Sequence, residues 1–248
     1  MKISVVTACF NSAKTIAYAV ESFLRQRHSD KELIVVDGAS TDDTLSIVRS
    51  FGADDLVVIS RPDRGPYDAM NSGLAAFRGD AVGFLNSDDR FKDEHSLSTF
   101  AGALEDADIA YGNLDFVSDH ESCRVVRRWR STPFHKRAFA NGWMPPHPTF
   151  YARRKVIDAV GRFDLRYRIA ADYDFMLRAM ELHDFRSAFI DRVLVDMMQG
   201  GDSTSGMRAY VISNFESLYS RRVWLDAGPI DRAFVAKPLR KLTQFVVR

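Results

Sequence analysis

Short apolar segments alternate with helix-like segments through the first hundred residues, and this alternation restricts the possible folds more than any other feature. Most of the apolar segments are rich in β-branched side chains, and they cover residues 3–7, 33–37, 56–60 and 82–86. Between the first two, an amphipathic segment places apolar side chains on one helical face, at Ile16, Val20, Phe23 and Leu24. Repeated strand–helix–strand units predict a doubly wound, mostly parallel sheet flanked by helices, which is an α/β fold.

Two more helices are predicted from their start signals. Ser40 and Asp43 form an S-x-x-D capping pattern before the apolar run that begins at Leu45. Pro66 can start a helix that runs to about Phe77. Both helices lie between predicted strands, as the doubly wound architecture requires.

The second half of the chain has a less regular pattern. Strands are expected at 109–113 and 125–129, and helices at 155–160 and 172–181. The intervening segment 133–148 is rich in Pro, aromatic residues and His. Because no internal repeat or low-complexity linker is present, we expect one compact domain with a less regular second half.

Charge is unevenly distributed, although the formal net charge is only +1. Residues 208–248 contain eight Lys/Arg and three Asp/Glu, a local balance of +5. Such a basic segment suggests an anionic partner, and a membrane surface is one candidate. Pro238 can open a short amphipathic helix that either lies on lipid or docks on its own domain. The small net charge of the whole chain argues against nucleic acid as a partner.

The cysteine content and the N-terminal residues indicate the compartment. Cys9 and Cys123 are too few for a disulfide framework and lack metal-ligand spacing, which favours a reducing compartment. The N-terminal apolar run is short and soon interrupted by polar residues, so it is typical of a strand and not of a signal peptide. No apolar stretch is long enough to cross a bilayer. We expect a cytoplasmic protein, either soluble or peripheral at the membrane.

Acidic residues follow two of the predicted strands. Asp37 ends the second strand, and Asp88 and Asp89 follow the fourth. Ligands of doubly wound sheets bind beyond the carboxyl ends of the strands. Adjacent carboxylates repel one another, and a divalent Mg or Mn ion held with phosphate oxygens would stabilise the pair. A solvated loop in which one acid caps the next helix is the alternative interpretation.

Three further residues are candidates for chemistry. Asp172 and Asp174 lie about 200° apart around a predicted helix, so only one of them can face a given site. Asp172 is nearer the helix start, where the dipole favours an ionised carboxylate that can act as a general base. His147 and Trp143 lie in the stiff Pro-rich segment and can contact a sugar, although a role in packing is the more common interpretation of such residues.

The motifs G-x-S-x-G, G-x-x-x-x-G-K-[ST] and G-x-G-x-x-G are absent, which excludes several enzyme classes.

Taken together, these segments resemble the family 2 glycosyltransferases, which have the glycosyltransferase A fold. The resemblance extends from Ser4 to Thr204, in family order, through SVVTACFNSAKT, ELIVVDGASTDDT, RPDRGPYDAMNSGLAAFRGDAVGFLNSDD, PPHPTFYARR, GRFD, IAADYDFMLR and GGDST. The run GPYDAMNSG is similar to a subgroup associated with bacterial surface polysaccharides, including the colanic-acid type. The resemblance implies a catalytic domain over 1–207, with a donor half of about 1–110 and an acceptor half of about 111–207. A basic helical extension over 208–248 would follow it.

The resemblance also implies roles for the nucleotide side of the site. Thr7, Phe10 and Asn11 would line the nucleotide pocket, and Asp37 would contact the base. Arg64, Gly65 and Asn71 would lie near the nucleotide and donor.

The remaining implied roles concern the metal and the reaction. Asp88 would approach the ribose, the sugar or the metal, and Asp89 would bind the metal, with Asn86 replacing the first acid of a strict D-x-D. Asp172 would be the base, although Ala171 stands where Glu often precedes it.

The reaction implied by the resemblance is transfer of a sugar from a nucleoside-diphosphate sugar, with inversion, to a saccharide or lipid-linked saccharide hydroxyl. The cofactor would be Mn or Mg. Two other functions stay open. A catalytically inactive sugar-nucleotide-binding protein would keep the strand-end acids without needing Asp172. A nucleotidyltransferase is less favoured because TACFNSAKT is not the Gly-rich, Arg-containing loop that it would need.

Overall fold

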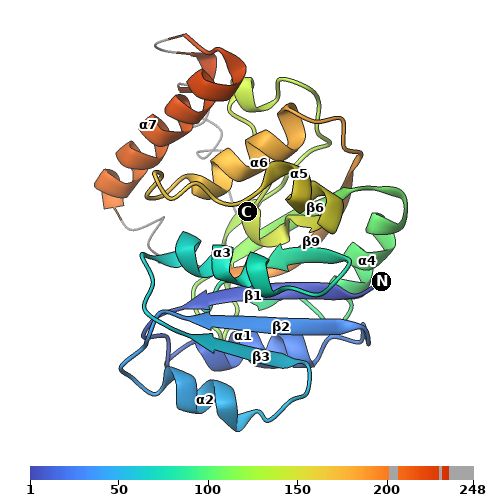
Figure 1. The fold of residues 1–248 in the computed structure, drawn as a ribbon, viewed down its shortest axis with the longest axis vertical. Helices are drawn as coiled ribbons and strands as arrows, with labels where there is room; N and C mark the ends of the chain where they lie inside the picture. The colour runs from blue at the N-terminus through green and yellow to red at the C-terminus, as the bar shows by residue number, and fades with distance from the viewer. Residues whose placement is uncertain (201–205, 229–230, 235–248) are drawn as a thin grey trace.

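The computed structural model describes residues 1–200, 206–228 and 231–234, and its first half is a parallel sheet (Figure 1). Four strands pair side by side in the order β3-β2-β1-β4. They are β1 (Ile3–Cys9), β2 (Lys31–Asp37), β3 (Leu56–Ser60) and β4 (Ala81–Phe84). The prediction of a parallel α/β sheet is confirmed, and each strand has nearly the predicted limits.

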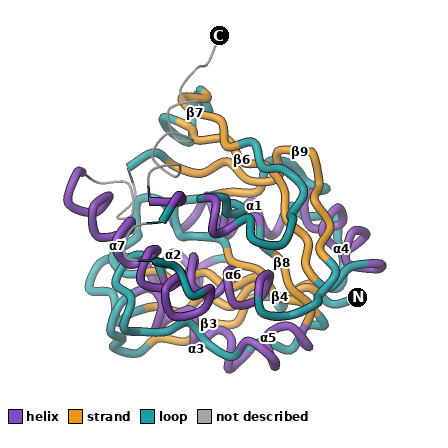
Figure 2. Tube along the Cα trace, turned by 90° about the horizontal axis from the view of Figure 1, so that it is seen from above, coloured by secondary structure: helices purple, strands orange, loops and turns teal. Residues whose placement is uncertain are grey.

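Helices cover both faces of this sheet, because alternate residues of each central strand point to opposite sides. Val6, Ile34 and Val36 enter one hydrophobic core, together with residues of α3, α5 and α6. Val5 and Leu33 enter the other core, together with residues of α1, α2 and α4 (Figures 1 and 2). The helices are α1 (Ile16–Leu24), α2 (Thr44–Ser50), α3 (Pro66–Ala76), α4 (Ser96–Asp106), α5 (Arg154–Val160) and α6 (Ala171–Glu181).

The second half continues the same sheet with mixed strand directions. β8 is antiparallel to both β4 and β6, while β9 is parallel to β6. β7 and β5 are antiparallel additions to β6 and β9. These strands are β5 (Arg90–Phe91), β6 (Ile109–Val117), β7 (Val125–Trp129), β8 (Tyr151–Arg153) and β9 (Ser187–Met198).

Several elements differ from the sequence-based expectations. The strands β5, β8 and β9 and the helix α4 are additional to those predicted. In β9 the register shifts opposite Gly112 and Asn113, and this irregularity breaks the alternating pattern that identifies a strand. Asp43 does occupy the N-cap position of α2, as the capping pattern predicts, but its side chain makes no capping hydrogen bond. Asp42 accepts from the backbone N–H of Thr44 at 3.0 Å, and the hydroxyl of Ser40 accepts from Asn11.

A twenty-residue helix, α7 (Gly206–Leu225), lies against α6 near the C-terminal end of the described chain (Figure 1). Asp174 of α6 is buried beneath it and holds the contact. Its carboxylate accepts from Arg178 Nε at 2.8 Å, from Ser220 Oγ at 2.8 Å and from Trp224 Nε1 at 2.9 Å. Asp174 therefore has a structural role, and the opposite orientations predicted for Asp172 and Asp174 are confirmed.

Two expectations for the C-terminal region concern membranes. The short helix expected from Pro238 lies outside the described residues. Across 1–200, 206–228 and 231–234, every helix is too short or too polar to span a bilayer.

Gly73 lets α3 approach the central strand β1. A Cβ at this position would lie 2.3 Å from Cγ1 of Val6, closer than packed atoms allow. We expect Gly73→Ala to lower the free energy of unfolding by about 1–3 kcal/mol, as measured by urea denaturation. The control is Gly102→Ala in α4, where a Cβ meets no atom within 4 Å. This control should gain about 0.5–1 kcal/mol, and equal losses in both variants would contradict the packing argument.

Removing the charge of Asp174 should destabilise the protein because Arg178 is then left buried without its partner. We expect Asp174→Asn to lower the free energy of unfolding by about 3 kcal/mol. Asp172→Asn, two residues away on the same helix, should change it by less than about 1 kcal/mol. Urea denaturation of both variants measures the difference. Similar values for the two would show that Asp174 does not hold α7 in place.

Candidate active site

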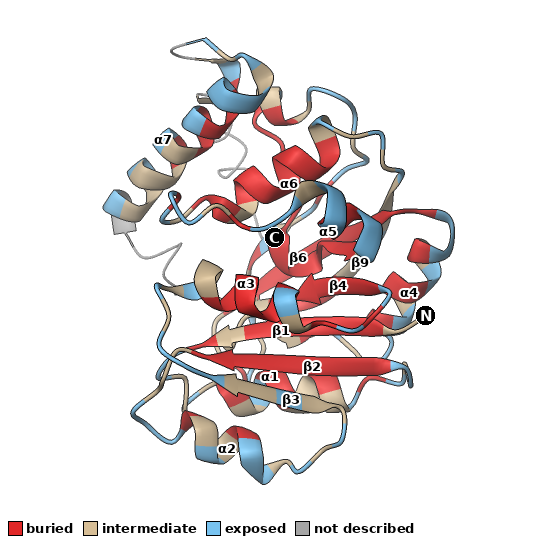
Figure 3. Cartoon of the chain, in the orientation of Figure 1, coloured by how far each residue is buried: buried red, intermediate tan, exposed pale blue. Residues whose placement is uncertain are grey.

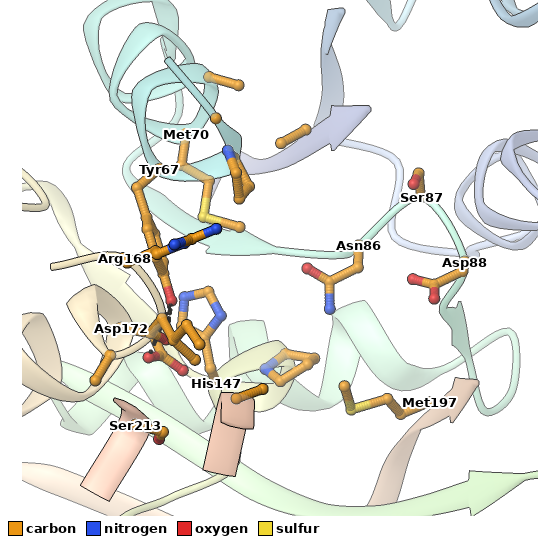
Figure 4. Close-up of a pocket in the computed structure, with 18 of the residues that line it drawn as sticks. Tyr67, Met70, Asn86, Ser87, Asp88, His147, Arg168, Asp172, Met197 and Ser213 are labelled. Atoms are coloured by element: carbon orange, nitrogen blue, oxygen red, sulfur yellow. Dashed lines mark hydrogen bonds between the residues drawn. The ribbon is translucent and has the colours of Figure 1, made fainter. Parts of the chain in front are cut away.

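A cleft of about 2190 Å³ lies at the carboxyl edge of the parallel strands. One wall is formed by the segments that follow β1 and β4 and by the start of α3. The other walls come from β7, the Pro-rich segment, the start of α6 and one side of α7. Figure 4 shows Asp88 at one end of this cleft and Asp172 and His147 at the other.

The structure brings eight of the twelve candidate residues to the cleft wall and places the other four behind it. The wall contains Phe10, Asn11, Arg64, Gly65, Asp88, Trp143, His147 and Asp172. The four residues that are buried away from the wall are Thr7, Asp37, Asn71 and Asp89.

The loop after β1 is fixed by Asn11, which has a left-handed backbone with φ of 49°. Its backbone N–H donates to Ser40 Oγ at 2.8 Å, and its side-chain oxygen accepts from the N–H of Thr41 at 2.9 Å. These bonds join the loops that follow β1 and β2. Phe10 is left with 60% of its surface exposed at the cleft, where a flat ligand can stack on its ring.

Asp37 lies directly beneath these loops and is fully buried. Its carboxylate accepts from the N–H of Ser40 at 3.1 Å and from Ser60 Oγ at 2.8 Å. Cys9 lies against it, and burial together with the Asp37 charge raises the pKa of the thiol to about 12. Asp37 therefore orders the loop through backbone contacts.

Asp88 and Asp89 have different surroundings although they are adjacent. Asp88 lines the cleft (Figure 4). Asp89 is fully buried, accepting from Asn86 Nδ2 at 2.7 Å and from the N–H of Met198 at 3.1 Å. Burial and the neighbouring Asp88 charge raise the pKa of Asp89 well above its usual range. Both Asp89 oxygens are used within the fold, and Asp88 is the member of the pair that reaches the cleft wall.

The start of α3 depends on Gly65, whose φ of 112° is accessible to glycine. Asp68 accepts from the N–H of Arg64 at 3.1 Å, which closes the turn. Further along the helix, the Asn71 side chain donates to the carbonyl of Phe163 and accepts from its N–H, both at 2.9 Å. Asn71 therefore fixes the segment that leads to α6.

Asp172 lines the cleft from the first turn of α6. Its Oδ1 accepts from the N–H of Tyr173 at 2.8 Å and lies 3.3 Å from the hydroxyl of Tyr67 (Figure 4). Burial, together with the Asp172 charge, raises the pKa of Tyr67 well above its usual range, so this phenol stays protonated. Both of these contacts involve Oδ1 of Asp172, and the residue lines the cleft.

His147 and Trp143 line the same cleft as Asp172 and have polar atoms without partners among the described residues. The buried atoms are Nε2 of His147 and Nε1 of Trp143. His147 stacks on Phe84 with ring centroids 5.1 Å apart. Burial lowers the pKa of His147, although the Asp172 charge acts in the opposite direction, so the imidazole is neutral at neutral pH. Unsatisfied buried polar atoms in a cleft wall are suited to bind ligand hydroxyl groups.

Sequence reasoning missed several cleft residues. β7 contributes a basic wall that contains Arg127, Arg128 and Arg130. Arg127 packs 4.1 Å from the centre of the Phe116 ring, and burial lowers its pKa to about 10. The sequence RRWR was the available signal, but its position beside the cleft depends on the pairing of β7 with β6. Tyr67 was also missed, although it lies within GPYDAMNSG.

The oxygen-bearing side chains near Asp88 are of the kind that bind a divalent metal ion. Among the residues that the structure describes, no group of three or more His, Cys, Asp or Glu side chains could hold a metal alone. A cleft-facing carboxylate next to the Asn86 amide does fit Mg or Mn, which commonly bind one or two carboxylates together with substrate phosphates. The metal would then be shared with the ligand.

Comparison with known proteins gives a consistent family. The model of glycosyl transferase family 2 matches residues 4–161. A PGL/p-HBAD biosynthesis glycosyltransferase of Mycobacterium bovis is 31% identical over 182 residues, which cover 71% of this chain and 68% of the relative. An uncharacterized glycosyltransferase of Mycobacterium tuberculosis is 34% identical over 182 residues, with the same coverage of both chains.

Solved structures agree on the fold. S. aureus TarS 1–349 in complex with UDP-GlcNAc has a TM-score of 0.71 at 21% identity, covering 97% of this chain and 72% of TarS 1–349. The mannosyltransferase PcManGT from Pyrobaculum calidifontis, in complex with GDP-Man and Mn²⁺, has a TM-score of 0.67 at 17% identity. That match covers 96% of this chain and 67% of the mannosyltransferase. The fold is the glycosyltransferase A fold, and the chain belongs to glycosyl transferase family 2.

Proposed function

We propose that this chain transfers a sugar from a nucleoside-diphosphate sugar to an acceptor hydroxyl, with inversion at the anomeric carbon. The observation that carries the proposal is one cleft with two carboxylates on different walls, Asp88 at the sheet edge and Asp172 on α6 (Figure 4). Asp88 is suited to the diphosphate end of a donor and Asp172 to the attacking hydroxyl. The UDP-GlcNAc bound to TarS supports a sugar nucleotide as the donor.

The nucleotide is assigned to the wall that follows β1 and β2. Phe10 offers a ring for stacking against the base, and the loop joined by Asn11 surrounds it. Thr7 and Asp37 are buried beneath this wall, and we assign them to its support in place of direct contact with the base. Arg64 and Gly65 border the donor, and Asn71 keeps the opposite segment in place.

The metal is assigned to Asp88, with Asp89 as its buried neighbour. Mn or Mg bound here together with the donor diphosphate would neutralise charge on the leaving group. Asp89 would not bind the ligand itself, because both of its oxygens accept hydrogen bonds from the protein.

Asp172 is assigned as the general base. An ionised carboxylate takes the proton of the acceptor hydroxyl as the hydroxyl oxygen attacks the anomeric carbon and the bond to the diphosphate breaks. The N–H of Tyr173 holds one oxygen of Asp172, which orients the carboxylate. The Tyr67 hydroxyl lies 3.3 Å from the same oxygen, and its shorter hydrogen bond, 2.5 Å, goes to the carbonyl of Ile169. The cleft supplies much of the rate by holding donor and acceptor together.

The acceptor is assigned to the wall that contains Trp143 and His147. Their unpartnered polar atoms belong to residues that line the same cleft as Asp172, and acceptor hydroxyl groups could provide the missing hydrogen bonds. We propose a saccharide or lipid-linked saccharide acceptor, used in bacterial cell-surface polysaccharide synthesis on the cytoplasmic side. Residues 1–207 would form the catalytic domain, with α7 completing one wall of its cleft, and the basic extension 208–248 would also contact the membrane.

The donor and metal are tested by thermal shift with a panel of nucleoside diphosphates and sugar nucleotides, with and without Mn²⁺. We expect one nucleotide family to raise the melting temperature by about 5–10 °C at a hundredfold excess over its Kd, more with Mn²⁺ than without. Asp88→Asn should remove the Mn²⁺-dependent part of this rise in melting temperature. Asp89→Asn should instead lower the melting temperature without ligand. If no nucleotide stabilises the protein even with Mn²⁺, the proposed function is wrong.

The base is tested by release of nucleoside diphosphate from the stabilising donor. Asp172→Asn should slow release at least 100-fold and leave the donor-induced thermal shift unchanged, because the amide cannot accept the proton. Asp158→Asn, an exposed acid on α5, is the control and should have wild-type activity. Unchanged release by Asp172→Asn would reject this base. A wild-type chain that binds donor but turns over no acceptor would favour the inactive binding protein.

The acceptor wall is tested by Trp143→Phe, which keeps a ring in the core and removes the Nε1–H donor. We expect the KM for a saccharide acceptor to rise about 3–10-fold, the value of one hydrogen bond, while the KM for the donor stays constant. Steady-state kinetics with each substrate varied in turn measures both. A rise confined to the donor KM would place Trp143 on the wrong side of the cleft.

A further inference from the structure

The helix α7 has its polar and apolar sides reversed relative to a helix on a water-exposed surface. The side that faces the protein is mostly polar, with Asn214, Ser217, Ser220 and Arg221 buried beside a single leucine, Leu218. The side that faces outward carries large apolar groups at four-residue intervals. They are Val211, Phe215, Tyr219 and Val223, with 44%, 58%, 49% and 46% of their surfaces exposed. Figure 3 shows this outer side as exposed or half-buried along its length.

The inner polar residues are held by specific bonds, so the orientation of α7 is fixed. Arg221 donates to Asp231 and, at 3.0 Å, to the hydroxyl of Tyr173. Ser220 donates to the buried carboxylate of Asp174 at 2.8 Å. Rotating the helix to hide its apolar side would break these bonds and leave buried charges unpaired. The outward apolar side is therefore a stable feature of the fold.

The charges on and after this side are almost all positive. Arg208 and Arg222 are exposed on the same side as the apolar residues. The carboxylate of Glu216 accepts hydrogen bonds from the backbone N–H groups of residues 168–170. The carboxylate of Asp231 accepts from Arg221. Asp226 lies after the end of the helix. Phe234 contacts the ring of Phe215, and residues 235–248 follow it in the sequence. That segment contains four Lys/Arg and no acid.

We propose that the outer side of α7, defined by Arg208, Val211, Phe215, Tyr219, Arg222 and Val223, lies on an anionic membrane surface. Apolar and aromatic side chains mixed with arginine, without a free acid on the same side, are typical of helices that lie in the headgroup region. The occupant is a lipid surface with negative headgroups.

The position of α7 links this surface to the cleft. Ala209, Ile212 and Ser213, on the next side of the same helix, line the cleft wall, and Arg208 of the outer side borders the cleft as well. A membrane against the outer side of α7 would therefore place the cleft rim at the headgroups. This position of the cleft favours an acceptor sugar that is carried on a lipid. That part of the inference rests on the proposed function.

The test is co-sedimentation of the full chain with vesicles of phosphatidylcholine alone or with phosphatidylglycerol, in the absence of donor and metal. We expect at least tenfold tighter binding to the anionic vesicles. The double variant Phe215→Ser, Tyr219→Ser should weaken that binding at least tenfold, and Arg222→Gln about fivefold. Val57→Ser and Arg49→Gln are matched controls, because both residues are exposed on β3 and α2 at the opposite end of the molecule (Figure 1).

Three results would overturn the proposal. The first is equal binding of the wild-type chain to both kinds of vesicle. The second is loss of binding in a Lys237→Gln, Arg240→Gln, Lys241→Gln variant with full binding by the α7 variants, since the tail would then act alone. The third is a dimer in solution that the double variant converts to monomer while vesicle binding persists. The donor-induced thermal shift of each variant shows whether the cleft is intact, which separates failure of this proposal from failure of the proposed function.

Discussion

The central constraint on this protein is that its parallel strands are buried on both faces. Val5 and Leu33 enter one core, while Val6 and Ile34 enter the other, so helices must cover the sheet on each side. The edge where the strands end is then the place where polar loops can gather. Parallel strands all end at that edge in the same direction, and the cleft is built there.

The acids near this edge divide into two groups by burial. Asp89 and Asp174 are buried and accept bonds from backbone or side-chain donors within the fold. Asp88 and Asp172 reach the cleft wall. The buried acids cost desolvation free energy that their hydrogen bonds offset, and they hold the cleft-facing residues in position. A carboxylate can serve a ligand only where the protein has left it accessible.

The helix α7 connects this division to the exterior of the molecule. Asp174 fixes α7 against α6 through Ser220 and Trp224, and this contact requires polar residues on the inner side of the helix. The apolar residues consequently face outward, next to the cleft rim. One buried carboxylate thus determines both the position of a cleft wall and the chemistry of the surface beside it.

The sequence by itself determined the parallel sheet, the helix from Pro66 and the strand-end position of Asp37, Asp88 and Asp89, because periodicity and turn residues act over a few neighbouring positions. It also indicated that Asp172 and Asp174 point apart, because helical geometry fixes that angle. Tertiary structure alone decided that Asp88 reaches the cleft and Asp89 does not, since the partner of Asp89, Met198, is 109 residues away. It likewise decided the place of β9, whose register shift hides its pattern, and of the basic wall on β7. Pairing between distant strands leaves no pattern in the local sequence, and the burial of each side chain depends on that pairing.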